Sequence, residues 1–418
     1  MGEMEDFPYE FTKPLLLCFN LLKRCNIGFF DDNVPFLQKY WRSFFIVPCV
    51  IIHYISTSIY VSRVFTSQIK ISELAFMVPV FLILTQGFLK AAVIIPKRAE
   101  IATLIRNLGM MWKTDNLSDI QLKKKNQQLR RLNFGHAVYY WGSIIATWQN
   151  LLAPLLLTLF RKFVLKQDTE FLLPFEYVYP FDPLENWIRY ICIYFQVISI
   201  VYHYIGTEFV IITICAHLST EFALLREDLK QIIPRKNKDQ AVTLMINDDD
   251  NAIRNFIQNH QKLIDRSIAY SLLLNEMILI SFFRLTRSLN KIFSPMVFID
   301  MFFVTVIMCF FGLAHGAVDI ANNFIAVLAL LLPIYILCYN AELLKVESTG
   351  IAESAYENLW YNGGAHYQKI IQFIIARSQR PCCLTSLNYV PITLNTFTKV
   401  LSTTWSYFSL ARSLYSNS

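Results

Sequence analysis

The amino-acid sequence predicts an all-α membrane protein with seven transmembrane helices. Apolar residues make up 55% of the 418 positions, and charged residues make up only 17%. Several apolar runs reach the length of about 20 residues that a helix needs to cross a bilayer. This composition argues against an ordinary soluble enzyme. The modest net charge of +7 gives little support to a nucleic-acid partner and points to the lipid bilayer instead.

Seven apolar runs are long enough to span a membrane: residues 41–61, 73–95, 134–160, 187–215, 292–313, 318–343 and 387–411. Another apolar run, residues 267–283, is short and contains Asn275 and Glu276. A charged side chain at the centre of a bilayer costs about 2.5–3.5 kcal/mol. We therefore interpret this run as a partly buried cytoplasmic extension of the fifth helix and not as an eighth span.

The distribution of basic residues predicts the orientation. The loop at residues 96–131 contains nine Lys or Arg, whereas the segments 62–72 and 161–186 and the tail after Leu410 contain two, three and one. Because Lys and Arg are retained on the cytoplasmic side, the N-terminus is expected inside the cell. After seven crossings the C-terminus is then extracellular, which is opposite to the topology of G-protein-coupled receptors.

Among the ionisable residues within the predicted spans, three bear on the packing of the helices. Lys90 lies near the inner end of the second span, where we expect its ammonium group to reach the membrane surface. Glu208 and Asp300 are expected in buried pairs, with an ion path as the alternative. No metal site is expected, because the acidic run at residues 247–250 lacks the spacing and the glycine of a calcium-binding loop.

The last span has one face of distinctive composition. Thr403, Ser406, Tyr407, Leu410 and Leu414 recur at three- and four-residue steps, which places them on one side of a helix. Hydroxyl groups can replace part of an ion's hydration shell, and a ring of leucines can block ions by excluding water. Cys382 and Cys383 are expected to open this helix, and Pro391 to bend it.

Four ordered groups of residues resemble insect odorant receptors. They are residues 173–182 (LPFEYVYPFD) with Gln196; residues 338–343 (CYNAEL) with Glu347-Ser348; Ala355-Tyr356, Trp360-Tyr361 and residues 374–381 (IIARSQRP); and the C-terminal pattern Thr396-Phe397, Val400-Leu401 and residues 406–410 (SYFSL). The first 130 residues match the family only in topology.

The resemblance implies an odour-tuned subunit of a ligand-gated, non-selective cation channel. Such a subunit assembles with the family's co-receptor, Orco, in a heterotetramer and opens on binding a small volatile apolar odorant. It implies the plasma membrane of olfactory sensory neuron dendrites, no cofactor and no enzymatic activity. The last helix then lines the pore, and the resemblance assigns the gate to Leu410 and Leu414.

The resemblance also implies a ligand site and a division of the chain. Residues 1–363 would form six transmembrane helices with the odorant pocket, and residues 364–418 a cytoplasmic anchor helix followed by the pore helix. The pocket is expected in the outer halves of the second, third, fourth and sixth spans, and its candidates are Phe76, Val80, Phe81, Thr147, Trp148, Leu151, Tyr194, Ile198, Tyr202, Phe324, Ile325 and Leu328.

Three alternatives differ in the features that they require. A gustatory-type receptor channel usually ends its last helix with a Gln-Phe pair, which is absent after Ser406-Tyr407. A G-protein-coupled receptor would need the opposite orientation, an outer cysteine pair and the Asp-Arg-Tyr motif. A membrane enzyme or transporter would need a His, Asp and Glu cluster, a P-loop or paired broken helices, and the sequence shows none of these patterns.

Overall fold

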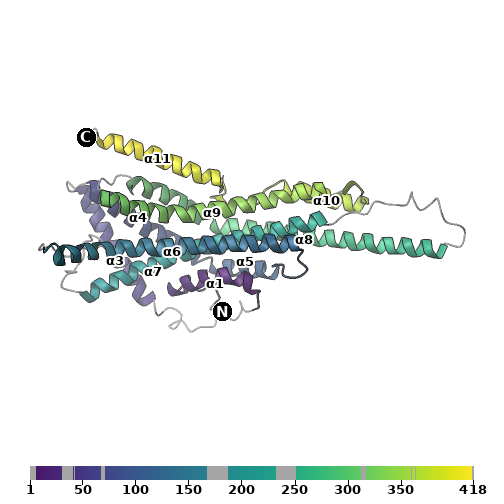
Figure 1. Cartoon of the computed structure of the whole chain (residues 1–418), viewed down its shortest axis with the longest axis horizontal. Helices are drawn as coiled ribbons and strands as arrows, with labels where there is room; N and C mark the ends of the chain where they lie inside the picture. The colour runs from purple at the N-terminus through teal and green to yellow at the C-terminus, as the bar shows by residue number, and fades with distance from the viewer. Residues whose placement is uncertain are drawn as a thin grey trace.

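The computed structural model is an elongated bundle of long helices that run beside one another (Figure 1). It describes residues 6–30, 41, 43–66, 71–166, 187–231, 251–311, 317–358, 360–362 and 364–416. The elements in these ranges are α1 (Tyr9–Arg24), α3 (Ser43–Thr66), α4 (Ile71–Ile94), α5 (Arg98–Met110), α6 (Asp119–Phe163), α7 (Trp187–Gln231), α8 (Asn251–Phe311), α9 (Ala317–Glu357), the 3-10 helix η4 (Trp360–Asn362), α10 (Ala365–Ser378), the strands β1 (Thr385–Ser386) and β2 (Val390–Pro391), and α11 (Leu394–Ser416).

A helix occupies each of the seven predicted spans, which confirms the all-α prediction. Among the described residues, three helical segments are long and apolar enough to cross a membrane on their own: Ile200–Lys230, Asn275–Phe310 and Phe324–Glu357. A fourth candidate is the pair α4 and α5, which are bent by 69° at a short break. The crossing of all seven spans stays a prediction.

Four helices are much longer than a bilayer is thick. α6 and α7 have 45 residues each and α9 has 41, so each is about 60–70 Å long, against about 30 Å for a hydrocarbon core. α8, with 61 residues, is continuous through residues 267–283, so the prediction of a helical extension is confirmed. Phe282 of this extension is buried and packs against Phe222 of α7, with ring centroids 5.4 Å apart.

The core is built around α7. Its residues from Ile205 to Leu225 are almost all buried, because apolar side chains occur on every face of this stretch and other helices surround it. The amphipathic α1 packs on α7 at Gly206, where an added Cβ would lie 2.7 Å from Leu22 Cγ. Glycine at this position therefore permits the close approach of the two helices.

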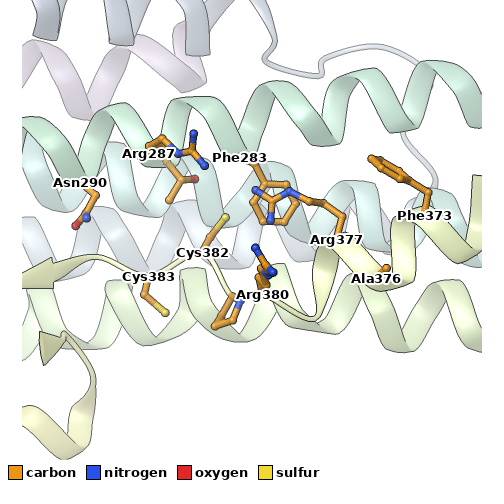
Figure 2. Close-up of a pocket in the computed structure, with 11 residues that line it drawn as sticks. Phe283, Arg287, Asn290, Phe373, Ala376, Arg377, Arg380, Cys382 and Cys383 are labelled. Carbon is orange, nitrogen blue, oxygen red and sulfur yellow. The ribbon is translucent and has the colours of Figure 1, made fainter. Parts of the chain in front are cut away.

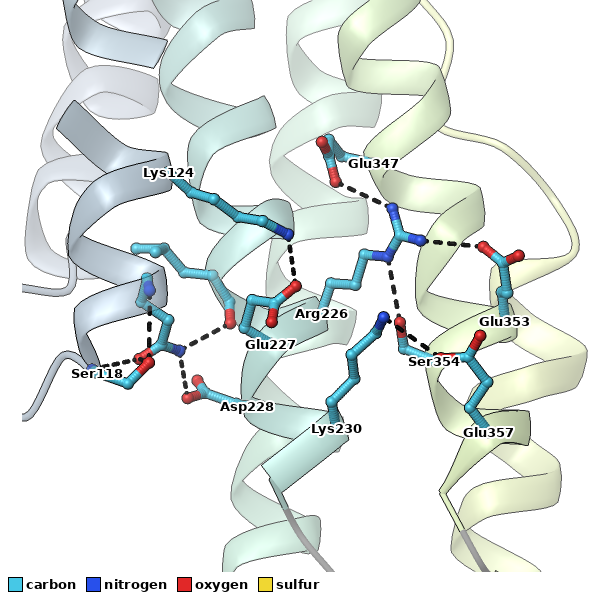
Figure 3. Close-up of polar contacts among 12 residues, drawn as sticks. Ser118, Lys124, Arg226, Glu227, Asp228, Lys230, Glu347, Glu353, Ser354 and Glu357 are labelled. Atoms are coloured by element: carbon cyan, nitrogen blue, oxygen red, sulfur yellow. Dashed lines mark hydrogen bonds and ion pairs between the residues drawn. The ribbon is translucent and has the colours of Figure 1, made fainter. Parts of the chain in front are cut away.

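Ion pairs join the ends of α6, α7 and α9 (Figure 3). Arg226 donates to Glu353 at 3.0 Å and to the Ser354 hydroxyl at 3.1 Å. Lys124 pairs with Glu227 at 2.5 Å on the α6 side. At its start, α6 has a capping box in which Ser118 and Gln121 each satisfy the other's backbone N–H. These contacts fix the relative positions of three helix ends beyond the apolar spans.

The segment before the last helix differs from the prediction. Residues 385–391 form a short hairpin, and its turn residues Leu387 and Asn388 have φ angles of 47° and 64°. Because the chain forms the β1–β2 hairpin before it becomes helical, α11 begins only at Leu394. The expectation that Cys382 and Cys383 open this helix is therefore wrong. Pro391 lies in β2, so it precedes the helix and does not bend it.

Candidate ligand site and pore helix

Eight of the twelve predicted ligand residues have described side chains. They lie on four helices, as the prediction requires: Val80 and Phe81 on α4, Thr147 and Trp148 on α6, Tyr202 on α7, and Phe324, Ile325 and Leu328 on α9. Phe76, Leu151, Tyr194 and Ile198 are helical, and their side chains lie outside the described part of the chain. The motif at residues 173–182 also lies outside the described residues.

The described candidates face different neighbours. The ring of Phe81 stacks on that of Tyr54 from α3, with centroids 5.3 Å apart. The ring of Tyr202 lies beneath the guanidinium group of Arg24, 4.9 Å away, at the end of α1. The Thr147 hydroxyl donates to the Ser143 carbonyl at 2.7 Å within α6, so its hydrogen is already used. It could still accept a hydrogen bond from a ligand.

Three candidates are on the outer surface of the chain. Trp148, Phe324 and Leu328 are 44%, 61% and 49% exposed. In a membrane protein such side chains face lipid or another subunit unless a ligand covers them. Val80 and Ile325 are half-buried and remain better placed to enclose a small molecule within this chain.

A cavity of about 250 Å³ lies between α3, α4, α7 and the residues after α1, and none of the twelve predicted ligand residues lines it. Leu84, Phe88 and Ile200 give it apolar walls, and His203 adds a polar group. Gly87 faces open space, since a Cβ built there meets no atom within 4 Å. The prediction missed this cavity. Gly87 does not reveal the cavity in the sequence, because Gly135, Gly142 and Gly206 also lie inside predicted spans and do not line it.

Buried charges lie next to this cavity. Lys90 of α4 lies between Glu208 of α7 and Asp300 of α8, and all three side chains are at most 3% exposed. Gln86 donates to Asp300 at 2.8 Å and to the Tyr204 hydroxyl at 3.2 Å. The ammonium group of Lys90 also lies 3.8 Å from the centre of the Tyr204 ring.

This charge cluster corrects one prediction and confirms another. Lys90 does not extend to the membrane surface, because two carboxylates inside the bundle hold its ammonium group. Glu208 and Asp300 form buried ion pairs with it, as predicted. A pair of this kind contributes little net stability, but breaking it by removing one partner costs about 3–5 kcal/mol. The cluster therefore fixes the arrangement of α4, α7 and α8.

One side of α11 packs against α8 and α9. Phe397 packs edge-on against Tyr335 of α9, with ring centroids 5.6 Å apart. Thr404 is buried and its carbonyl lies 3.9 Å from the Cys309 sulfur of α8. Farther along, α11 stands apart from the other helices up to the C-terminus (Figure 1).

The predicted pore residues are on the other side of α11. Thr403 and Ser406 are exposed, and Tyr407 and Leu410 are 57% and 56% exposed. Leu414 is helical, and its side chain is outside the described set. The structure thus places the four described members on a surface that this chain leaves uncovered. An apolar and hydroxylated surface of this kind in a membrane protein suits an interface or an aqueous path between subunits.

The start of α11 is tied to α8 and α9 by hydrogen bonds. The Thr385 N–H donates to Asn290 Oδ1 at 2.7 Å, and the Asn388 N–H donates to the Ser294 hydroxyl at 3.0 Å. On α9, Glu342 accepts from the Leu394 N–H at 3.3 Å. This carboxylate lies at the positive end of the α11 dipole, which is a favourable position for a negative charge. Motion of α8 or α9 would therefore reach α11 directly.

Comparisons with known proteins agree with these observations. A family model described as "7tm Odorant receptor" matches residues 70–405. Odorant receptor 85c of Drosophila melanogaster is 21% identical over 327 residues, which are 76% of this chain and 77% of that protein. Putative odorant receptor 92a of the same species is 34% identical over 134 residues, which are 31% of this chain and 33% of that relative.

Two solved structures share the fold. One is the insect olfactory receptor OR5 from Machilis hrabei, with a TM-score of 0.74, 14% identity, and coverage of 96% of this chain and 97% of that chain. The other is the same receptor in complex with eugenol, with a TM-score of 0.74, 13% identity, and coverage of 97% of both chains. At these identities the likeness is one of fold.

Proposed function

Because the chain belongs to the insect odorant receptor family, we propose that it is the odour-binding subunit of a ligand-gated, non-selective cation channel. Membership makes it a multi-pass membrane receptor and not an enzyme. It would assemble with the co-receptor Orco in a heterotetramer, in the dendritic plasma membrane of olfactory sensory neurons. Its N-terminus would be cytoplasmic and its C-terminus extracellular, with seven spans between them.

The observation that carries the channel proposal is the uncovered face of α11. Thr403, Ser406, Tyr407 and Leu410 are exposed on a helix that the rest of the chain supports from one side only. Surrounded by equivalent helices from other subunits, the hydroxyl groups would line an aqueous path. The leucines near the C-terminal end would form a narrow ring that loses its water when closed.

The ligand would be a small apolar volatile molecule. A site of this kind needs apolar walls and few polar groups, and α4, α6, α7 and α9 provide such side chains at the predicted positions. The relative OR5 has been solved with eugenol, a small aromatic molecule, which supports this class of ligand. The candidates that are both described and half-buried are Val80, Phe81, Thr147, Tyr202 and Ile325.

Odorant binding would open the pore only to the extent that the ligand binds the open state more tightly. A physical route exists from the predicted ligand helices to α11. Glu342 and Ser348 on α9 hold the segment that leads into α11, and α9 also carries Phe324, Ile325 and Leu328. A shift of α9 around the odorant would therefore move the start of the pore helix.

The test is whole-cell current in cells that express this chain with and without the co-receptor, during exposure to volatile esters, terpenoids and alcohols. We expect a rapid, non-selective cation current that needs both subunits and that Leu410→Ala alters. Ser409→Ala is the matched control, because Ser409 is exposed on the same turn but off the predicted pore face. Absence of current despite confirmed surface expression would refute the channel proposal, and equal effects of both substitutions would refute the assignment of Leu410 to the pore face.

A further inference from the structure

A second cavity, of about 550 Å³, lies between α8, α10 and the segment that connects α10 to β1 (Figure 2). Phe283, Arg287 and Asn290 line it from α8, and Arg377 lines it from α10. The connecting segment adds residues 380–383. This cavity is separate from the predicted odorant site, and the proposed channel function gives it no role.

Its charge is strongly positive. Arg287, Arg377 and Arg380 line it, and no Asp or Glu does. Within the described part of the chain, none of the three has a carboxylate at ion-pair distance, in contrast to Arg226, which pairs with both Glu347 and Glu353. Three cations that share one cavity repel one another, and a bound anion would remove that cost.

Two of the three guanidinium groups lie near one aromatic ring. Figure 2 shows Arg377 and Arg380 extending toward the ring of Phe283, with Arg287 beside them on α8. Arg377 lies 3.6 Å from the centre of that ring, which holds its planar group in place. A guanidinium group held in this way can bind two phosphate oxygens at once, so Arg377 favours phosphate over a simple halide.

The cavity lies at the level of the inner membrane surface in the proposed orientation. Arg287 precedes the predicted start of the fifth span by five residues, which is about 7.5 Å along a helix. Anionic lipids are concentrated in this leaflet and attract clustered basic residues just inside the membrane. The volume is within the range of about 300–1,000 Å³ that small-molecule sites occupy.

We infer that this cavity binds the headgroup of an inner-leaflet lipid that carries several phosphates. The inference rests on the proposed orientation for the choice of lipid over a soluble phosphate ester. Arg377 and Arg380 would hold one phosphate and Arg287 another, so that the headgroup would join α8 to α10.

The bound headgroup would also steady the approach to the pore helix. Cys382 and Cys383 form part of the cavity wall, and the Cys382 N–H donates to the Ser348 hydroxyl of α9 at 3.0 Å. Two residues after Cys383, Thr385 is bonded to Asn290, which itself lines the cavity. Occupancy would therefore restrain the segment from which α11 begins.

Binding of a fluorescent, short-chain phosphatidylinositol bisphosphate to the purified full-length chain tests the inference. The experiment uses the chain alone and in complex with the co-receptor, and fluorescence polarisation gives the affinity. The double variant Arg377→Gln/Arg380→Gln should bind at least about tenfold more weakly, because each charge-assisted hydrogen bond that is lost costs that much or more. Arg287→Gln, a single change on α8, should weaken binding independently.

The matched control is Lys123→Gln/Arg130→Gln, which removes the same charge from two exposed positions on α6. An equal loss of affinity in both double variants would mean that the lipid is attracted only by the charge of the protein surface, and this result would overturn the inference. Failure of the wild-type complex to bind while the isolated chain binds would also overturn it, since an acidic segment of a neighbouring subunit would then fill the cavity. Because the assay measures lipid binding, its result does not depend on whether the protein conducts ions.

Competition separates the two sources of phosphate. If inositol trisphosphate or ATP displaces the probe at lower concentration than the lipid itself, the ligand is a soluble phosphate ester, and the assignment to a lipid is overturned. If the lipid competes best, the assignment stands. A second readout is alkylation of Cys383, which is half-buried in the cavity wall and should become protected when the headgroup is bound.

Discussion

The ammonium group of Lys90 lies 2.5 Å from the carboxylate of Asp300, with both side chains buried inside the bundle. The two residues come from α4 and α8, and Gln86 of α4 also donates a hydrogen bond to Asp300. Glu208 of α7 completes the cluster on the other side of Lys90. A buried charge without its partner is much more costly than a neutral side chain in the same place. The cluster is thus a sensitive test of the fold.

Lys90→Met should destabilise the protein by about 3–5 kcal/mol, because it leaves Glu208 and Asp300 buried without their cation. Thermal unfolding of the detergent-solubilised protein would show this as a lower Tm, and surface expression should fall. Lys123→Met, at an exposed position on α6, is the control. Neutralising the carboxylates of Glu208 and Asp300 in the Lys90→Met variant should recover part of the lost thermal stability, seen as a higher Tm than that of Lys90→Met alone. An unchanged Tm for the single variant would contradict the role of the cluster.

The helices were predictable from the sequence because an apolar run of about 20 residues is a local property. The pairing of the Lys90 ammonium group, in contrast, depends on contacts between distant parts of the chain. Its partners are 118 and 210 residues away along the chain, and the position of Lys90 near a helix end suggested exposure instead. A pairing across three helices depends on how those helices pack, which one sequence does not reveal.

The start of the last helix shows a second limit. Residues 387–393 are apolar enough to extend the predicted span, yet Leu387 and Asn388 adopt positive φ angles in a hairpin turn. Asparagine tolerates this conformation, whereas leucine rarely adopts it. Contacts with Asn290 and Ser294 of α8 hold the turn, so tertiary structure overrides the local preference. Helical periodicity predicts that Thr403, Ser406, Tyr407 and Leu410 share one face of α11, and all four are exposed there. The assignment of this face to the pore stays a prediction.

The same substitution at two glycines should have opposite effects. Gly87→Ala adds a methyl group in open space, and it should stabilise the protein by about 0.5–1 kcal/mol through helix propensity. Gly206→Ala places a methyl group 2.7 Å from Leu22 Cγ, so it should destabilise the contact between α1 and α7 by about 1–3 kcal/mol. Thermal unfolding should give a raised Tm for the first and a lowered Tm for the second. Shifts of the same sign would argue against the packing of α1 or the cavity at Gly87.

Cys382 should resist alkylation at neutral pH. Burial raises the pKa of its thiol to about 12, and the thiolate is the reactive form. At pH 8 only about one thiol in ten thousand would be ionised, against about a quarter for an ordinary cysteine. The rate should rise about tenfold per pH unit through pH 9 without levelling off, as followed by mass spectrometry with iodoacetamide.

A cysteine introduced by Gln379→Cys is the matched control, because position 379 is exposed three residues before Cys382. Its alkylation should be fast at pH 7 and should level off near the ordinary thiol pKa of about 8.5. If Cys382 reacts as quickly as the introduced cysteine, the segment between α10 and β1 does not pack against α8 and α9 as the structure shows.

Lys399 offers a test of the pore face itself. It precedes Thr403 by four residues, so it lies on the same side of α11, and its side chain is exposed. If this face lines the ion path of the proposed channel, a positive charge there opposes divalent cations twice as strongly as monovalent ones. Lys399→Gln should therefore raise the permeability to calcium relative to sodium, seen as a positive shift of the reversal potential when calcium replaces sodium outside. Lys399→Arg keeps the charge and should leave the reversal potential unchanged. Identical reversal potentials in Lys399→Gln and the wild type would mean that the face of Thr403 and Leu410 is turned away from the ions.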